Sequence, residues 1–110
     1  MTFTELNNPE ELTTFLNENS SSCIITFSAT WCGPCKATKP RLMEMAATSP
    51  IPIGYVYEEN LEDFLDVFVK ITGFPTYILF QNGQEKARVQ GANLDGLQKM
   101  IQDNAAPLSS

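Results

Sequence analysis

One stretch of this chain decides the fold that we expect for it: Trp31-Cys32-Gly33-Pro34-Cys35-Lys36. It follows an uncharged run, 23–27, whose β-branched residues are typical of a buried strand. The residues from Lys36 to about Thr48 have a helical pattern, so the two cysteines lie where a strand passes into a helix. Cysteines at this spacing beside a βαβ pattern indicate a pair that exchanges between dithiol and disulfide.

Outward from this stretch, the pattern predicts the order β-α-β-α-β-α-β-β-α in one domain over 1–106, with a frayed tail at 107–110. Strands are expected at 3–6, 23–28, 51–57, 76–81 and 84–89, and helices at about 9–19, 36–48, from 61 and from 94. Asn8, Asn60 and Asn93 stand at N-cap positions, and Asn82-Gly83 indicates a hairpin between the last two strands. Crossover helices make the early strands parallel, so we expect a mixed sheet with helices on both faces. Pro40 should kink the second helix.

The composition excludes several classes of function. The 110 residues carry a net charge of −6, which argues against nucleic acid or an anionic membrane surface as partner. No apolar stretch approaches the ~18 residues of a membrane-spanning helix. The first residues are not basic, so we expect no targeting segment in this sequence and a cytoplasmic protein, with a trimmed organellar transit peptide as the alternative. Three cysteines and no histidine exclude a Cys-His nucleophile and leave too few ligands for zinc, so no metal is expected.

The positions of the two cysteines predict different roles for them. Cys32 is expected at the start of the second helix, where free N–H groups and the helix dipole lower a thiol pKa below its ordinary ~8.5. Lys36 adds a positive charge one turn later, whereas Cys35 lies further in and has less reason to ionise. We therefore expect Cys32 to attack a substrate disulfide and Cys35 to resolve the mixed disulfide. Gly33 allows another backbone to approach, and Pro34 stiffens the turn.

The chain resembles the thioredoxin family over nearly its whole length. The matching residues are Phe27, Ala29, Trp31-Cys32-Gly33-Pro34-Cys35-Lys36, Pro40, Gly73-Phe74-Pro75-Thr76, Phe80, Asn82-Gly83 and Gly91-Ala92. The resemblance implies an α/β thioredoxin fold, with a mixed five-stranded sheet of order 1-3-2-4-5 flanked by four helices. It also implies a monomeric reductase of disulfide-containing target proteins that a thioredoxin reductase recharges. No bound cofactor is expected beyond the redox-active Cys32–Cys35 disulfide, so any NADPH or ferredoxin dependence belongs to the reductase.

The resemblance further implies a substrate site beside the dithiol. Phe74-Pro75 matches the family's cis peptide, which leaves the backbone of Phe74 free to pair with an extended substrate segment. From the residues alone, an ordinary trans proline that opens a strand is the favoured alternative. The shallow apolar rim that would dock a substrate consists of Trp31, Pro34, Phe74, Pro75, Gly91 and Ala92.

Three positions depart from the family pattern. Thr26 stands six residues before Cys32, where the family carries a buried Asp credited with moving protons for the second cysteine. The usual Lys is missing from 51–57, and Ser28 replaces a bulky aromatic residue. A threonine hydroxyl can hydrogen-bond but cannot act as a base near neutral pH. We therefore hypothesise normal attack by Cys32 and slower, more pH-dependent resolution by Cys35.

The residues alone leave other interpretations open. The cysteine pair could be structural or bind a metal, and the domain could be a binding module or regulatory subunit with weak or narrow redox activity. An oxidant or isomerase of a secretory compartment is disfavoured by Gly33-Pro34, because such relatives usually carry His within the pair. Cys23 is expected to be a small buried hydrophobe, with glutathionylation or intermolecular pairing as the alternative. A solvated face, or a surface that steers a basic partner, is expected at Glu58, Glu59, Glu62, Asp63 and Asp66.

Overall fold

The computed structural model describes residues 3–61 and 70–105. Its strands are β1 (Phe3–Leu6), β2 (Cys23–Ser28), β3 (Ile53–Tyr57), β4 (Thr76–Gln81) and β5 (Gln84–Gln90). Its helices are α1 (Pro9–Glu18), α2 (Gly33–Thr48) and α4 (Leu94–Asn104), with a short 3-10 helix, η1 (Glu58–Asn60). The third predicted helix, from 61, falls on 62–69 together with Glu62, Asp63 and Asp66, and the predicted tail falls on 107–110; 62–69 and 107–110 lie outside the described residues.

The five strands form one sheet in the order β1-β3-β2-β4-β5, as the resemblance implied. β1 and β2 both run parallel to β3, whereas β4 runs antiparallel to β2 and to β5. β2 therefore lies at the centre, and all six of its residues are buried, as expected for an interior strand. Because β2 and β3 are parallel, both of them end at the same edge of the sheet.

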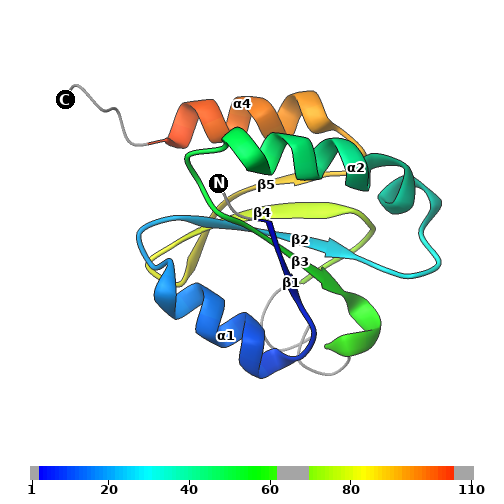
Figure 1. The fold of residues 1–110 in the computed structure, drawn as a ribbon, viewed down its shortest axis with the longest axis horizontal. Coiled ribbons are helices and arrows are strands. Elements are labelled where there is room, and N and C mark those ends of the chain that lie inside the picture. Colours follow the sequence, from blue (N-terminus) through cyan, green and yellow to red (C-terminus); the bar gives the residue numbers. More distant parts are fainter. Residues whose placement is uncertain (1–2, 62–69, 106–110) are drawn as a thin grey trace.

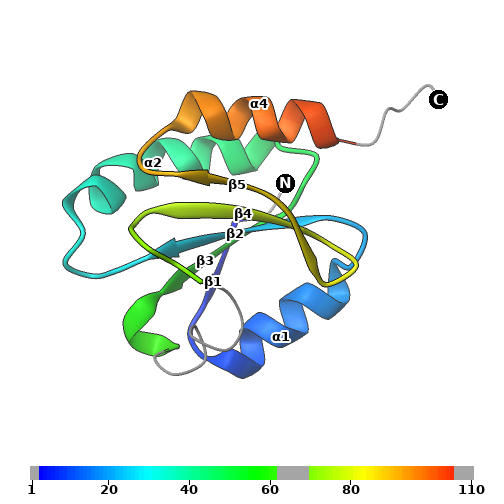
Figure 2. The same cartoon turned by 180° about the vertical axis from the view of Figure 1, so that it is seen from behind.

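Helices cover both faces of this sheet. Figures 1 and 2 show α1 on one face and α2 beside α4 on the other. Successive residues of β2 serve opposite faces, because side chains alternate along a strand. Ile25 packs in the cluster that includes Phe15 of α1, and Ile24 packs in the cluster that includes Leu42 of α2 and Leu97 of α4.

Asparagine side chains cap the first and last helices, and an Asn-Gly pair forms the turn of the hairpin. The Asn8 side chain accepts a hydrogen bond of 2.8 Å from the Glu11 N–H at the start of α1. The Asn93 side chain accepts one of 2.9 Å from the Gly96 N–H at the start of α4. In the β4–β5 hairpin, Asn82 and Gly83 have φ values of 55° and 77°, as the Asn-Gly signal predicts.

The second helix begins earlier than its hydrophobic pattern indicates. α2 starts at Gly33 rather than at Lys36, because the side chain of Cys32 caps it, and it continues through Pro40. Strand β3 is shorter than predicted and begins at Ile53. Within the described residues, no helix combines the length and apolar character needed to cross a bilayer.

Candidate functional site

The two cysteines of the motif form a disulfide at the N-terminus of α2. Their Cα atoms are 5.3 Å apart, and only 4% of Cys32 and 2% of Cys35 is exposed. Cys32 is the N-cap residue, and its Sγ accepts a hydrogen bond of 3.1 Å from the Cys35 N–H. The Lys36 N–H donates to the Cys32 carbonyl at 3.2 Å, so the first turn of the helix is formed around this residue. The two sulfurs thus have different surroundings, because a backbone N–H of the first helical turn donates to Cys32.

The residues of the motif that flank the cysteines lie at the surface. Gly33, Pro34 and Lys36 are exposed, and a Cβ added at Gly33 would meet nothing within 4 Å. Trp31 is 66% exposed, an unusual position for so large an apolar side chain. The backbone beside the disulfide is therefore open to a second polypeptide.

A cis peptide bond joins Phe74 to Pro75, so the trans alternative does not apply to this structure. The Phe74 side chain packs against Cys32 and Cys35, and its ring lies edge-on to Trp31 with centroids 5.7 Å apart. The Gly91 N–H donates to the Pro75 carbonyl at 2.8 Å, with Gly91 at a φ of 83°. These contacts bring predicted rim residues from three separate parts of the chain to the disulfide.

The structure places the rim residue Ala92 beside α2. It lines a shallow pocket with Ala37, Thr38 and Arg41 of α2. Ala92 thus faces the second and third turns of that helix, and it reaches the site through its neighbour Gly91.

Two carboxylates that sequence reasoning assigned to a solvated face support the loop before Cys32. Glu59 accepts hydrogen bonds from the Thr30 N–H at 3.2 Å and from the Thr30 hydroxyl at 2.5 Å. Glu58 accepts one from the indole N–H of Trp31 at 3.3 Å. The hydrogen bond from the Thr30 side chain lowers the pKa of Glu59. The sequence could have placed both carboxylates at the site through their position, because they directly follow β3, and β3 ends beside the end of β2.

Two of the positions that depart from the family pattern, Thr26 and Ser28, lie buried on β2. Thr26 is fully buried, and its hydroxyl has no hydrogen-bond partner among the described residues. Directly opposite it in the β2–β4 ladder, the buried Tyr77 hydroxyl also makes no hydrogen bond within the described ranges. Burial raises the pKa of Tyr77, and the Thr38 side chain of α2, which lies near this hydroxyl but outside hydrogen-bond geometry, opposes part of that rise. Ser28 instead donates to the Val56 carbonyl at 2.7 Å.

A lysine side chain reaches β3 from helix α2, whereas the family's usual lysine lies at 51–57. Lys39 of α2 places its ammonium 4.8 Å from the ring centroid of Tyr55 and 5.4 Å from that of Tyr57. It donates to the Tyr57 hydroxyl at 2.9 Å and forms an ion pair of 2.6 Å with Glu5. Burial alone would lower the pKa of Lys39, but these two hydrogen bonds raise it. A cation therefore lies near β3 although β3 itself has no lysine.

The third cysteine, Cys23, lies in a different apolar cluster from the Cys32–Cys35 disulfide. Cys23 is a free thiol, 1% exposed, within the apolar cluster beneath α1. Burial raises its pKa to about 11. Among the described residues, no group of three or more histidine, cysteine, aspartate or glutamate side chains is arranged to hold a metal ion.

Comparisons with known proteins point to one family. The family model described as Thioredoxin matches residues 3–103. The thioredoxin of Echinococcus granulosus is 40% identical over 83 residues, which cover 74% of this chain and 77% of that protein. Thioredoxin-1 of Saccharomyces cerevisiae is 36% identical over 84 residues, covering 74% of this chain and 80% of its own. The crystal structure of Schistosoma mansoni thioredoxin matches with a TM-score of 0.86 at 28% identity, over 94% of this chain and 95% of that one.

Proposed function

The chain belongs to the thioredoxin family and is a thioredoxin-type dithiol–disulfide oxidoreductase, and on that premise we propose how its residues divide the reaction. Cys32 is the nucleophile and Cys35 the resolving thiol. One observation carries this assignment: Cys32 caps α2, and its sulfur receives the Cys35 N–H at 3.1 Å. A thiolate at Cys32 is stabilised by that N–H and by the helix dipole, whereas no N–H of residues 3–61 or 70–105 donates to the Cys35 sulfur.

The reaction consumes the reduced form of the protein. The Cys32 thiolate attacks one sulfur of a substrate disulfide, and the other substrate sulfur leaves and takes up a proton. Cys35 then loses its proton and attacks the Cys32 sulfur, which forms the Cys32–Cys35 bond and releases the second substrate thiol. Two electrons have passed to the substrate, and a thioredoxin reductase supplies two electrons to restore the dithiol.

The substrate lies as an extended segment across the disulfide. The exposed ring of Trp31 and the side chain of Phe74 form the apolar contact, and the backbone beside Pro75 pairs with the substrate strand. Pro34, Gly91 and Ala92 complete the rim. The open space around Gly33 supports this placement, because a substrate backbone must approach there.

Proton transfer is the step in which this chain differs from its family. Resolution requires Cys35 to give up a proton. At the position where the family carries a buried Asp as base, this chain has Thr26, whose buried hydroxyl has no partner in the described part of the chain. The proton therefore leaves by a slower route, and resolution depends more steeply on pH.

The remaining features of the proposal follow from the same chemistry. The protein works as a monomer on disulfide-containing proteins, with no cofactor bound to the chain itself. A reducing compartment, and the cytoplasm in particular, is consistent with the free buried thiol of Cys23.

Reduction of insulin driven by dithiothreitol tests the proposal. The wild-type protein should accelerate insulin precipitation, and Cys32→Ser should abolish that activity. With dithiothreitol removed, the prereduced Cys35→Ser variant should react once with insulin and keep a mixed disulfide on Cys32, visible by intact-mass spectrometry. Biological activity that survives the double substitution Cys32→Ser and Cys35→Ser would instead identify a binding module.

A further inference from the structure

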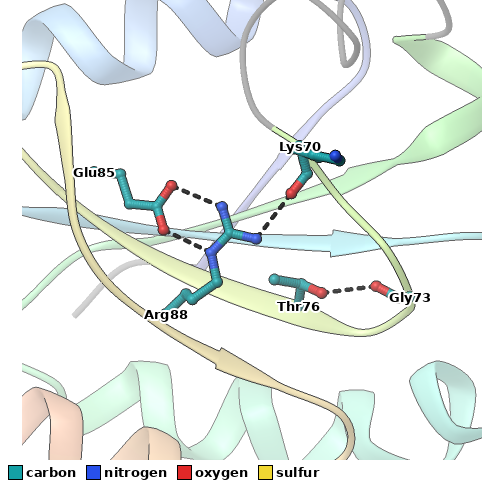
Figure 3. Close-up of polar contacts among 5 residues, drawn as sticks. All are labelled: Lys70, Gly73, Thr76, Glu85 and Arg88. Atoms are coloured by element: carbon teal, nitrogen blue, oxygen red, sulfur yellow. Dashed lines mark hydrogen bonds and ion pairs between the residues drawn. The ribbon is translucent and has the colours of Figure 1, made fainter.

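Side chains of the last two strands, β4 and β5, donate hydrogen bonds to the segment that carries Phe74 into the site. It runs from Lys70 to Pro75, and Ile71 and Phe74 pack against the apolar cluster beneath α1. The guanidinium of Arg88 donates through Nη1 to the Lys70 carbonyl at 2.8 Å. Figure 3 shows Arg88 lying between that carbonyl and the carboxylate of Glu85.

Arg88 is itself held in place by a bidentate ion pair. Its Nε and Nη2 donate to the two carboxylate oxygens of Glu85 at 2.6 Å and 2.7 Å. Both side chains are only partly exposed, at 25% for Arg88 and 35% for Glu85. A guanidinium offers this planar fork and a further N–H at once, which an ammonium group cannot do with the same geometry.

A strand irregularity makes this pair possible. Side chains three residues apart on a regular strand point to opposite faces. The β4–β5 register shifts between Leu79, which pairs with Ala87, and Phe80, which pairs with Glu85, so Lys86 is left without a partner in the ladder. This bulge puts Glu85 and Arg88 on the same face of the sheet, the face that the segment 70–75 covers.

Three hydrogen bonds, called anchors below, hold the segment, and the one from Arg88 to the Lys70 carbonyl is the first along the chain. Further on, the Thr76 hydroxyl donates to the Gly73 carbonyl at 2.7 Å, and the Gly91 N–H donates to the Pro75 carbonyl at 2.8 Å. Figure 3 shows the Thr76 contact at the bend where the segment turns into β4. The three anchors fix the segment at its start, its bend and its end.

We propose that Arg88, oriented by Glu85, is a positioning residue that fixes the segment 70–75 and thereby sets the affinity of the site for protein disulfides. The inference rests on the proposed function. A polypeptide substrate pairs with the backbone beside Pro75 and contacts Phe74, so it gains affinity from a segment already held in place. A small disulfide needs only the sulfur of Cys32 and is indifferent to the segment.

Steady-state kinetics and hydrogen exchange test this role. Arg88→Lys and Arg88→Ala are compared with Lys99→Ala, which removes an exposed cation from an ion pair on α4. We expect KM for insulin to rise roughly two- to fivefold in both Arg88 variants, the size of a partly exposed charged contact, with kcat unchanged. The rate with a small aromatic disulfide should stay at the wild-type value. Amides of 71–74 should exchange faster in the Arg88 variants, and Lys99→Ala should behave as wild type in every assay.

Several outcomes separate this inference from the function on which it rests. Wild-type exchange and wild-type KM in Arg88→Ala would overturn the positioning role while leaving the reductase intact. Equal losses with insulin and with the small disulfide would also overturn it, because they would place the effect at Cys32. A wild-type protein that does not reduce insulin at all would overturn the proposed function, whereas the exchange measurement would still decide whether Arg88 anchors the segment.

Discussion

At the scale of single residues, the proposed slow loss of the Cys35 proton depends on a buried hydroxyl, that of Thr26. Thr26 lies in the centre of the sheet beneath α2, opposite Tyr55 on one side and Tyr77 on the other. Neither the Thr26 nor the Tyr77 hydroxyl finds a partner among the described residues, which is rare for buried polar atoms. A threonine hydroxyl is not a base near neutral pH, so this position offers none.

Thr26→Asp should therefore speed up turnover near neutral pH, by roughly three- to tenfold if a general base becomes available to Cys35. The ladder partner of Thr26 on β3 is Tyr55, and the ammonium of Lys39 lies 4.8 Å from the Tyr55 ring centroid. Thr26→Asn is the uncharged control. Unchanged turnover and an unchanged mixed-disulfide lifetime in a stably folded Thr26→Asp variant would refute the missing-base hypothesis.

A second residue-scale prediction concerns Cys23, whose pKa burial raises from 9.0 to about 11. The folded state prefers the neutral thiol, so the stability that this preference contributes is complete below pH 9.0 and is lost as the pH rises through about 11. Between pH 8 and 10.5, wild type should lose on the order of 1–2 kcal/mol more stability than Cys23→Ala. Denaturant unfolding of the oxidised protein measures this difference. Parallel curves for the two proteins would show that Cys23 does not titrate as its burial predicts.

At the scale of elements, capping decides where each helix begins and thereby places the site. Asn8 and Asn93 cap α1 and α4 through side-chain oxygens, whereas α2 uses the sulfur of Cys32. A sulfur is a weaker acceptor than an amide oxygen while it is neutral, and a stronger one once it is charged. The cap of α2 is therefore also its reactive atom, and the helix gains from the ionisation that the reaction needs.

Replacement of a cap remote from the site should affect stability alone. Asn8→Ala removes the 2.8 Å hydrogen bond to the Glu11 N–H and should lower the free energy of unfolding by about 1 kcal/mol. Insulin reduction by the folded variant should not change, because α1 covers the face of the sheet opposite α2 (Figure 1). Thr13→Ala, at an exposed position of the same helix, is the matched control and should cost no stability. An equal loss in both variants would show that the cap contributes nothing specific.

At the scale of the whole molecule, charge and surface composition favour a single chain. The net charge is −6, and the large apolar side chains that stand exposed in the described residues are Trp31 and Met43. Isolated apolar residues on a charged surface do not form the extended patch that a stable dimer requires.

Size-exclusion chromatography with light scattering should therefore give the mass of one chain at micromolar concentration, in both the oxidised and the reduced state. Cys23 should not change this result on prolonged air oxidation, because the thiol is buried. A dimer that dithiothreitol dissociates would instead support the intermolecular pairing of Cys23, and Cys23→Ala would abolish it.

The elements that sequence reasoning placed correctly are those with local signals. The caps at Asn8 and Asn93, the Asn82-Gly83 hairpin and the buried strand 23–28 each depend on neighbours within a few residues. The strand order came from family resemblance and is confirmed. The supporting residues of the site were missed, because Glu59 meets Thr30 across 29 positions of sequence and Lys39 meets Glu5 across 34.

The sequence by itself determined the reactive pair and its place between a strand and a helix, since both are a matter of residue type and spacing, and the family resemblance singled out Thr26 as a position without a base. Only the tertiary structure decided what surrounds the pair. Parallel pairing of β2 with β3 brought Glu58 and Glu59 to the loop before Cys32, and the bulge at Lys86 turned Arg88 toward the segment that carries Phe74. Such contacts follow from the register of strands and the path of loops, and no local pattern in a chain encodes either of them.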